Sequence, residues 1–378
     1  MDITGAKACA TVAREAEPPT VTLSRMRGRE GRGCAAVGVW LFVCCALIFL
    51  MVVVGGITRL TLSGLSITQW EPVIGVVPPL STAGWAVEFE KYQQISEYRL
   101  IRYGMMLDEF KSIYWWEYAH RLLGRLIGVA FAVPFVWFLV CGRLPRRLIA
   151  PLCGILLLGF AQGGLGWYMV ESGLAERVEV SQYRLVAHLA LALAIYAAIL
   201  WVALGIVREP ARRDLGRGWR RAAEVVLFFV ALTILAGGFV AGTRAGLIYN
   251  TFPLMDGRAM PEGYAQLHPF VLNWFENIAA VQFDHRLLAV VTAVVILLVW
   301  AAGRRAVLPR PAHAALHGLV AATALQVALG ITTLVLVVPI PLAAAHQAGA
   351  VLLLTAAIVF RHTLRGVAPM DEKAPAPI

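Results

Sequence analysis

The stretch YWWEYAHRLLGRLIG, residues 114–128, places four ionisable side chains within about two turns of an otherwise apolar helical pattern. They are Glu117, His120, Arg121 and Arg125. Hydrocarbon disfavours such groups, and ionisable residues inside membrane spans usually mark functional sites. The stretch therefore predicts a membrane helix that begins at a functional site.

The composition of the whole chain supports a membrane protein. Of its 378 residues 59% are hydrophobic and only 15% are charged, and the mean hydropathy is +0.72. Soluble domains carry roughly a quarter charged residues, and apolar runs long enough to cross ~30 Å of hydrocarbon recur here. Because the runs are continuous rather than alternating, they predict helices and not barrel strands. The expected fold is an all-α polytopic membrane protein with eight spans, at 36–56, 119–141, 148–170, 183–207, 222–243, 277–301, 313–338 and 341–363.

The placement of the charges predicts the topology. Of the 33 Lys and Arg residues, 21 fall in the N-terminal tail, in alternate connections or after residue 360, which is the positive-inside pattern. Both termini are then cytoplasmic, and the net charge of +10 needs no nucleic-acid partner. The expected organisation is a disordered tail (1–35), an N-terminal half (36–207) with a long outer loop (57–118), a linker (208–221), a C-terminal half (222–363) and a second tail (364–378).

The two halves repeat the same motifs in the same order. Gly55-Gly56 and Gly237-Gly238 close the first span of each half, HRLL occurs at 120–123 and 285–288, and QGGLG at 162–166 matches QVALG at 326–330. Each half has an even number of spans, so both halves have the same orientation. The repeat therefore predicts two four-helix bundles related by a pseudo-twofold axis along the membrane normal.

Four histidines occupy matching places in these halves. His120, His188, His285 and His346 fall in the first turns of spans 2, 4, 6 and 8, so they share a depth near the outer surface. A lone histidine would favour a helix-to-helix hydrogen bond, but two matched pairs favour axial ligation of haem iron, one haem per half. Zinc would need further ligands that are missing at this depth. His313 and His317 are spaced as a metal pair but have no third ligand, and His362 is expected to be solvated or interfacial.

Arginines and glycines fit the same interpretation. Each haem carries two propionate carboxylates, and guanidinium groups would neutralise their charges. Four arginines lie at the outer ends against the charge trend, namely Arg59, Arg121, Arg244 and Arg286. Snorkelling to lipid head groups is the alternative for each. The glycines at 55–56, 163–164 and 237–238 would admit a flat macrocycle, or equally close helix packing; Arg125 has no assigned partner.

One difference between the halves points to chemistry. Glu117 precedes His120 by three residues on the same helical face, whereas the counterpart before His285 is Gln282. An acid in only one half suggests that the reaction takes place there. The alternative is an interfacial glutamate paired with Arg121 or Lys111. The loop 57–118 shows helical spacing of apolar residues, so it predicts one or two interfacial helices and a lid.

Four motifs carry a resemblance to a known family. GGITRLTLSGLSITQWEPVIGVVPP, EYAHRLLGRLIG, GGFVAGTRAGLIYNTFPLMDG and DHRLLA resemble haem A synthase, in its proteobacterial and mitochondrial branch, over about 36–363. The resemblance implies oxidation of a ring methyl of haem O to a formyl group. It also implies that His120 and His188 hold the substrate haem O, that His285 and His346 ligate a haem b cofactor, and that Glu117 is the acid of the family's E-x-x-H-R motif. Another branch has paired cysteines in the outer loops, which this chain lacks there.

The resemblance also implies a setting. It is the inner membrane of a bacterium, with the haem sites near the periplasmic side, and the expected partners are haem O synthase, cytochrome oxidase assembly factors, membrane lipid and a second copy in a homo-oligomer. The histidines alone leave open a quinol-linked di-haem b-type electron-transfer protein, and less readily a transporter with a His and Glu proton relay. The contrast between Glu117 and Gln282 and the long first loop favour the enzyme.

Overall fold

The computed structural model describes residues 19–70, 74–175, 178–208 and 216–365. Within these ranges eight helices are long and apolar enough to cross a membrane, which confirms the predicted all-α polytopic fold. They are α1 (Pro19–Leu60, with its apolar part at Ala35–Leu60), α4 (Leu107–Val140), α5 (Arg146–Ala175), α6 (Gln182–Val207), α7 (Gly216–Thr243), α9 (Ile278–Arg304), α10 (Arg310–Val335) and α11 (Ile340–Thr363).

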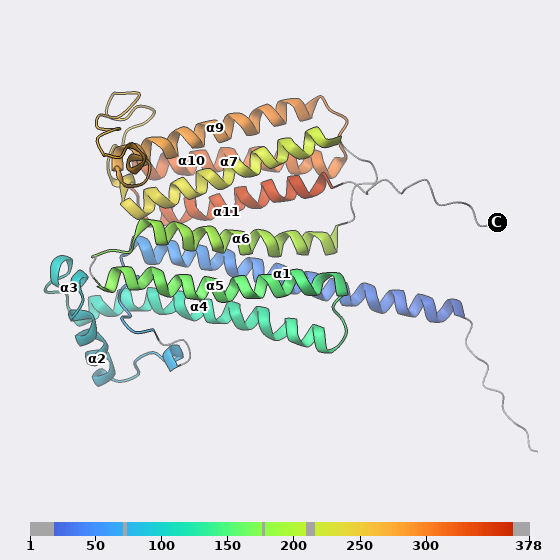
Figure 1. Ribbon diagram of the computed structural model, residues 1–378, viewed down its shortest axis with the longest axis horizontal. Helices are drawn as coiled ribbons and strands as arrows, with labels where there is room; N and C mark the ends of the chain where they lie inside the picture. The colour runs from blue at the N-terminus through green and yellow to red at the C-terminus, as the bar shows by residue number, and fades with distance from the viewer. Residues whose placement is uncertain (1–18, 71–73, 176–177, 209–215, 366–378) are drawn as a thin grey trace, which may run out of the picture.

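The helices of each predicted half lie together. In Figure 1, α4, α5, α1 and α6 lie on one side and α7, α9, α10 and α11 on the other. Helix α1 packs against α4 and α6, and α5 packs against α6, whereas α7 packs against α9 and α11, and α10 against α11. The halves meet where α6 contacts α7 and α11, and where α1 contacts α11. The pseudo-twofold relation between the halves stays a prediction.

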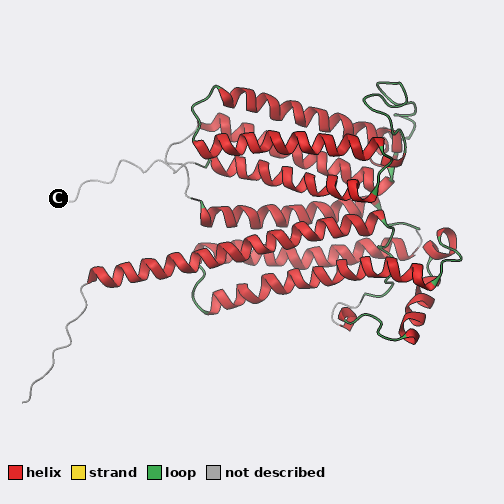
Figure 2. Ribbon diagram, turned by 180° about the vertical axis from the view of Figure 1, so that it is seen from behind, coloured by secondary structure: helices red, strands yellow, loops and turns green. Residues whose placement is uncertain are grey.

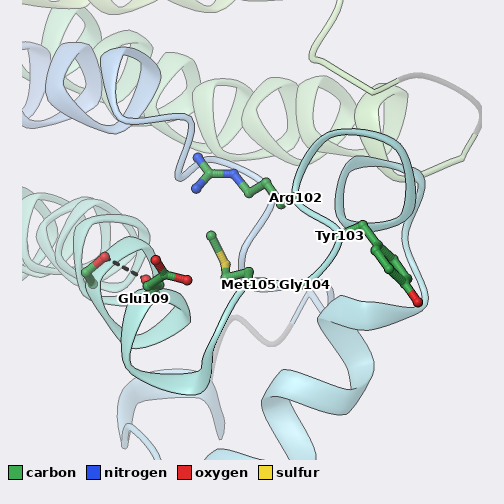
Figure 3. Close-up of a pocket in the computed structure, with 6 residues that line it drawn as sticks. Arg102, Tyr103, Gly104, Met105 and Glu109 are labelled. Atoms are coloured by element: carbon green, nitrogen blue, oxygen red, sulfur yellow. Dashed lines mark hydrogen bonds between the residues drawn. The ribbon is translucent and has the colours of Figure 1, made fainter.

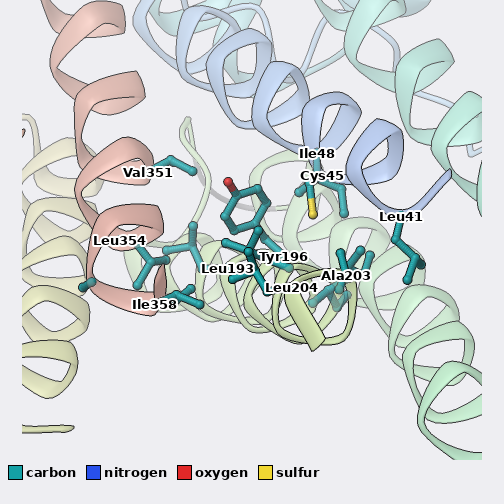
Figure 4. Packing of buried hydrophobic residues seen from close by; sticks show 14 of the residues in the cluster. Leu41, Cys45, Ile48, Leu193, Tyr196, Ala203, Leu204, Val351, Leu354 and Ile358 are labelled. Carbon is teal, nitrogen blue, oxygen red and sulfur yellow. The ribbon is translucent and has the colours of Figure 1, made fainter. Parts of the chain in front are cut away.

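Apolar side chains fill the space where the halves meet. Figure 4 shows Tyr196 and Leu193 of α6 beside Val351, Leu354 and Ile358 of α11. The hydroxyl of Tyr196 also forms a hydrogen bond of 2.7 Å with that of Thr355 on α11. Lipid tails are as apolar as these side chains, so close packing and such hydrogen bonds, rather than hydrophobic transfer, hold membrane helices together.

The long connections gather at one end of the molecule, which we call the loop end (Figure 2). There α1 finishes at Leu60 and α4 begins at Leu107. The described residues between them, 61–70 and 74–106, form a cap with the short helices η1 (Ile74–Val76), α2 (Thr82–Gln93) and α3 (Ser96–Ile101). In the second half, residues 244–277 contain only η2 (Ala245–Leu247), η3 (Phe270–Leu272) and α8 (Asn273–Glu276).

The cap has an apolar core of its own. Tyr92 of α2 and Phe110 of α4 are fully buried, and Leu65, Ile113 and Tyr114 complete the cluster with Ile95 and Tyr98. The N-terminus of α2 is capped, because the Ser81 hydroxyl accepts a hydrogen bond from the Gly84 amide (3.1 Å). The helices predicted within 57–118 are present as α2 and α3, while their place at the membrane interface stays a prediction.

Three helix starts differ from the predicted boundaries. Helix α4 begins at Leu107 rather than 119, because its first turns pack on the cap instead of lipid. Helix α1 begins at Pro19, inside the predicted tail 1–35, and α7 begins at Gly216, inside the predicted linker 208–221. The rest of both segments, 1–18 and 209–215, and most of the tail 364–378 lie outside the described residues.

Candidate functional site

Each of the four predicted histidines is half-buried and packs against a glycine of the neighbouring helix. A methyl group added to that glycine would lie 2.9–3.3 Å from the nearest ring atom. The pairs are His120 with Gly55, His188 with Gly166, His285 with Gly237, and His346 with Gly330. The same contact thus recurs twice in each half, between α1 and α4, α5 and α6, α7 and α9, and α10 and α11.

The glycines at 55 and 237 were predicted to allow a close approach, and what approaches them is an imidazole. Gly163 and Gly164, predicted in the same way, have no atom within 4 Å of an added methyl group. Gly166 and Gly330 take the contact instead. They are the last residues of the QGGLG and QVALG motifs, so their matched positions in the repeat could have identified them from sequence.

The glutamines that begin these two motifs fix the histidine backbone. Gln162 Nε2 donates to the carbonyl oxygen of His188 (3.1 Å), and Gln326 Nε2 donates to that of His346 (3.0 Å). Sequence reasoning used both glutamines only as markers of the repeat. Their matched hydrogen bonds hold one histidine of each half in place.

The spare nitrogen atoms of the histidines fit axial ligands. The ring of His120 lies near that of His188, and the ring of His285 near that of His346, close enough for a charge on one ring to affect the other. Three of the four rings have a buried Nδ1 without a hydrogen-bond partner in the described chain, those of His188, His285 and His346. No group of three or more His, Cys, Asp or Glu side chains suited to a metal occurs among the described residues. Two imidazoles per half therefore fit a metal whose other ligands come from a macrocycle.

Glu117 is buried, at 2% exposure, and its carboxylate accepts four hydrogen bonds. Oε2 accepts from the Ser66 hydroxyl (2.8 Å) and the Ile67 amide (2.7 Å), and Oε1 accepts from Arg121 Nε (2.9 Å) and Nη2 (2.6 Å). Of the two partners that the alternative interpretation named for Glu117, Arg121 is the one present, whereas Lys111 pairs with Asp108. Arg121 also donates to two carbonyl groups of the loop after α1, those at 67 and 69.

The second half repeats this arrangement with an amide in place of the carboxylate. Gln282 Nε2 donates to the carbonyl groups of Ala245 (2.8 Å) and Ile248, and its Oε1 accepts from Arg286 (3.1 Å). A carboxylate can only accept hydrogen bonds, whereas an amide also donates them. Glu117 therefore faces donors alone, whereas Gln282 faces two acceptors and one donor, so the two side chains are not interchangeable.

Arg59 and Arg244, one from each half, meet on a glutamate that sequence reasoning missed. Arg59 Nη2 lies 2.9 Å from Glu179 Oε2, and Arg244 Nη2 lies 2.5 Å from Glu179 Oε1. Glu179 belongs to the connection between α5 and α6 and carries no motif, so nothing in the sequence distinguished it. Through this carboxylate the end of α1 is tied to the end of α7. Arg59 and Arg286 each keep a buried Nε that has no partner within the described ranges.

The remaining histidines are placed outside this site. His317 Nδ1 accepts a hydrogen bond from Trp300 Nε1 (3.1 Å). In the metal pair considered for His313 and His317, this nitrogen atom is therefore already occupied. His362 is not solvated, because it is 4% exposed and its Nε2 lies 2.6 Å from Arg365 Nη1. Arg125 lies one turn beyond Arg121 on α4.

Comparison with known proteins agrees with the geometry of the site. The sequence model of the family described as cytochrome oxidase assembly protein matches residues 38–358. A "Heme A synthase" of Nitrosospira multiformis is 53% identical over 332 residues, which cover 87% of this chain and 93% of that protein. A "Heme A synthase" of Rhodospirillum centenum is 52% identical over 350 residues (92% and 93%), and one of Arabidopsis thaliana is 46% identical over 345 residues (88% and 75%). The chain therefore belongs to the haem A synthase family of cytochrome oxidase assembly proteins, membrane oxidoreductases that convert haem O to haem A.

Proposed function

We propose that the two halves share this reaction unequally. The first half holds the substrate haem O between His120 and His188, and the second half holds a haem b cofactor between His285 and His346. The main support is that both halves repeat the histidine and glycine pairs, while among the described residues a buried carboxylate accompanies these pairs in the first half alone. Haem b, when bound, supplies one-electron transfer. An electron-transfer protein without chemistry is not favoured, since the relatives are named heme A synthases.

Glu117 is the proposed catalytic residue. Oxidation of a ring methyl group develops positive character at its carbon, and a fixed carboxylate would stabilise that charge. Arg121, Ser66 and Ile67 hold the carboxylate through four hydrogen bonds. A pre-organised carboxylate needs no reorganisation when charge develops, which makes its electrostatic effect larger than that of a mobile one.

The arginines are proposed to hold the haem carboxylates. Arg59 and Arg286 each have a buried Nε still available as a donor, one per half. We assign the direct contacts to these two residues. Arg121 and Arg244, also predicted to bind propionates, would act from beside them, because Arg121 forms an ion pair with Glu117 and Arg244 forms one with Glu179.

The setting completes the proposal. The charge pattern supports cytoplasmic termini and a loop end that faces the periplasm of a bacterial inner membrane. Haem O synthase would then supply the substrate, and oxidase assembly factors would receive the product. Homo-oligomer formation is proposed from the family resemblance alone.

Replacement of Glu117 by alanine tests the catalytic assignment. We expect Glu117→Ala to reduce haem A formation by about 100-fold or more, the size of effect seen when one pre-organised electrostatic group is removed. Low-spin haem b should remain, because Glu117 is not a proposed iron ligand. The measurement is pigment extraction from purified protein produced with a haem O source, together with its absorption spectrum.

Asp108→Ala is the matched control, since Asp108 is an exposed acid on the same helix. It should make haem A at the normal rate. Normal haem A formation by Glu117→Ala would refute the assignment of Glu117.

A further inference from the structure

The loop that follows α1, residues 61–69, is held from two sides. From the membrane side, Glu117 binds the Ser66 hydroxyl and the Ile67 amide. From the cap, Arg102 Nη2 donates to the carbonyl groups of Thr61 (2.9 Å) and Leu62 (3.1 Å). Figure 3 shows the Arg102 side chain reaching toward the blue segment after α1, while Tyr103 points away from it. The groups that donate hydrogen bonds to Glu117 and the groups that accept them from Arg102 therefore belong to one short segment.

The part of this loop that Arg102 contacts has an unfavourable backbone conformation. Leu62 has φ 54°, a left-handed conformation that residues with a side chain disfavour. Around it, the Leu62 amide donates to the Arg59 carbonyl (3.2 Å) and the Ser63 amide to the Thr58 carbonyl (2.9 Å), the bonds with which a glycine normally ends a helix. Leucine in the glycine position leaves this turn dependent on contacts from outside, and Arg102 supplies two of them.

Glu97 orients Arg102. Its Oε1 lies 3.2 Å from Arg102 Nε, and its side chain is 5% exposed. Burial, opposed by the nearby charge of Arg102 and aided by the charges of Glu117 and Glu179, raises the pKa of Glu97 to about 7. The titratable groups that face Glu97 are Tyr92 of α2, Arg102 after α3, Glu117 of α4, Glu179 between α5 and α6, and Arg59 of α1.

Arg102 also lines an open hollow of about 510 Å³ on the cap. The hollow is formed by residues 102–105 together with Glu109 and Ser112 (Figure 3). Solvent in the hollow reaches Arg102, so protons can exchange with the buried pair that Arg102 forms with Glu97.

The second half has no such clamp in the part of it that the structure describes. Its corresponding loop, 244–251, is held by Gln282 and Arg286, and by Asn250, whose Nδ2 donates to the Leu334 carbonyl (2.9 Å). The clamp therefore accompanies the proposed catalytic carboxylate and occurs in the same half.

We propose that Arg102, oriented by Glu97, is a positioning residue for Glu117. It holds loop 61–69 so that Ser66 and Ile67 present their donors to the carboxylate, and it holds the loop most firmly when Glu97 is ionised. The inference rests on the proposed catalytic role of Glu117.

Hydrogen exchange of the purified full-length protein tests the clamp without reference to activity. In Arg102→Gln we expect the amides of 61–69 to exchange about tenfold faster or more, because local opening is no longer opposed by the guanidinium bonds. Peptides of α5 and α10 should keep their rates, which shows that the variant is folded. Arg102→Lys retains the charge and should recover part of the protection. Lys111→Gln, which removes another cation of the loop end, is the control and should leave 61–69 unchanged, and equal exchange in Arg102→Gln and the parent would overturn the proposal.

The role of Glu97 is tested by pH. After correction for the intrinsic rate, exchange of 61–69 in the parent should slow as pH rises through about 7, because ionised Glu97 then orients Arg102. In Glu97→Gln the corrected rate should not change over this range. A pH dependence that survives in Glu97→Gln would refute the role of Glu97.

Kinetics link the clamp to the reaction and separate the two proposals. Arg102→Gln should lower kcat of haem A formation by about tenfold or more, since small misplacement of a catalytic group is costly, while KM for haem O changes less than about threefold. If Glu117→Ala is inactive but Arg102→Gln retains both kcat and exchange rates, the positioning inference fails and the catalytic role stands. If Glu117→Ala is active, the catalytic role fails, whatever the exchange shows.

Discussion

The contact between a histidine and a glycine is the smallest repeated unit of the site. Each imidazole occupies space that a methyl group on the facing helix would take. Glycine at these positions therefore serves close approach, and no positive φ requires it there. Each ring can take its position only because the facing glycine has no Cβ. This matters for a metal site, because metal ligands must keep a closely defined geometry.

The glycine that faces His346 tests this dependence. In Gly330→Ala the added methyl group would lie 2.9 Å from His346 Cε1, so the ring must move. We expect bound haem b to fall severalfold, with a shift of its low-spin absorption bands. Absorption spectra and pyridine haemochrome quantification of the purified protein measure both.

Gly318→Ala is the control on the same helix, because nothing lies within 4 Å of a methyl group there. Helix α10 should gain slightly in stability from alanine in either variant. A Gly330→Ala protein with full haem b content and an unshifted spectrum would show that the glycine contact does not set the position of His346.

At the scale of elements, the cap is a small structural unit built around aromatic rings. The ring centroid of Phe110 lies 5.2 Å from that of Tyr92 and 5.1 Å from that of Phe89, which joins the first turn of α4 to α2. Phe110→Ala should cost the cap about 3–5 kcal/mol, because Phe110 is fully buried. Proteases should then cut within 61–106 faster, while the spectrum of haem b in the other half is retained.

Tyr103→Ala provides the comparison, since this aromatic residue of the cap is exposed. Its rate of proteolysis should match the parent. If Phe110→Ala is cut no faster than Tyr103→Ala, the cap does not depend on the cluster around Phe110.

The elements also show where prediction from sequence succeeds. Hydropathy predicted all eight spans, because hydrocarbon demands long apolar runs whatever they pack against. It placed the start of α4 too late, because the first turns of that helix bury Phe110 and Tyr114 against the cap rather than in lipid. The repeat located the four histidines and the pair Glu117 and Gln282. It could not locate Glu179 or Arg102, whose partners lie far away in the sequence and meet them only through the fold.

In the whole molecule, a few polar contacts join the halves. Gln347, which follows His346, donates through Nε2 to the Val52 carbonyl of α1 (2.9 Å), and the amide rests on Gly56. The matching contact places Leu189, which follows His188, against Gly238. In each glycine pair, the first glycine contacts a histidine of its own half, and the second glycine contacts a side chain of the other half. The histidine sites and the junction of the halves are therefore built from the same turns of α1 and α7.

Glu179 joins the halves through two ion pairs. Its carboxylate separates the like charges of Arg59 and Arg244, which repel each other without it. The Arg59 side chain is largely buried, so solvent screens this repulsion poorly. We expect Glu179→Gln to lower stability by about 1–3 kcal/mol, more than the ~0–1 kcal/mol of an exposed pair. The Tm of the purified protein in detergent, from helical circular dichroism, measures the loss.

Glu224→Gln removes the matching charge at the opposite end, where Glu224 is more exposed and pairs with Arg361. It should change Tm much less than Glu179→Gln. Adding Arg244→Gln to Glu179→Gln should recover part of the loss, because one of the two repelling charges is gone. If Glu179→Gln and Glu224→Gln lower Tm equally and the double variant is no better, the carboxylate does not join the halves. The connection would then rest on the packing of α6 against α7 and α11, and on Gln347 and Tyr196.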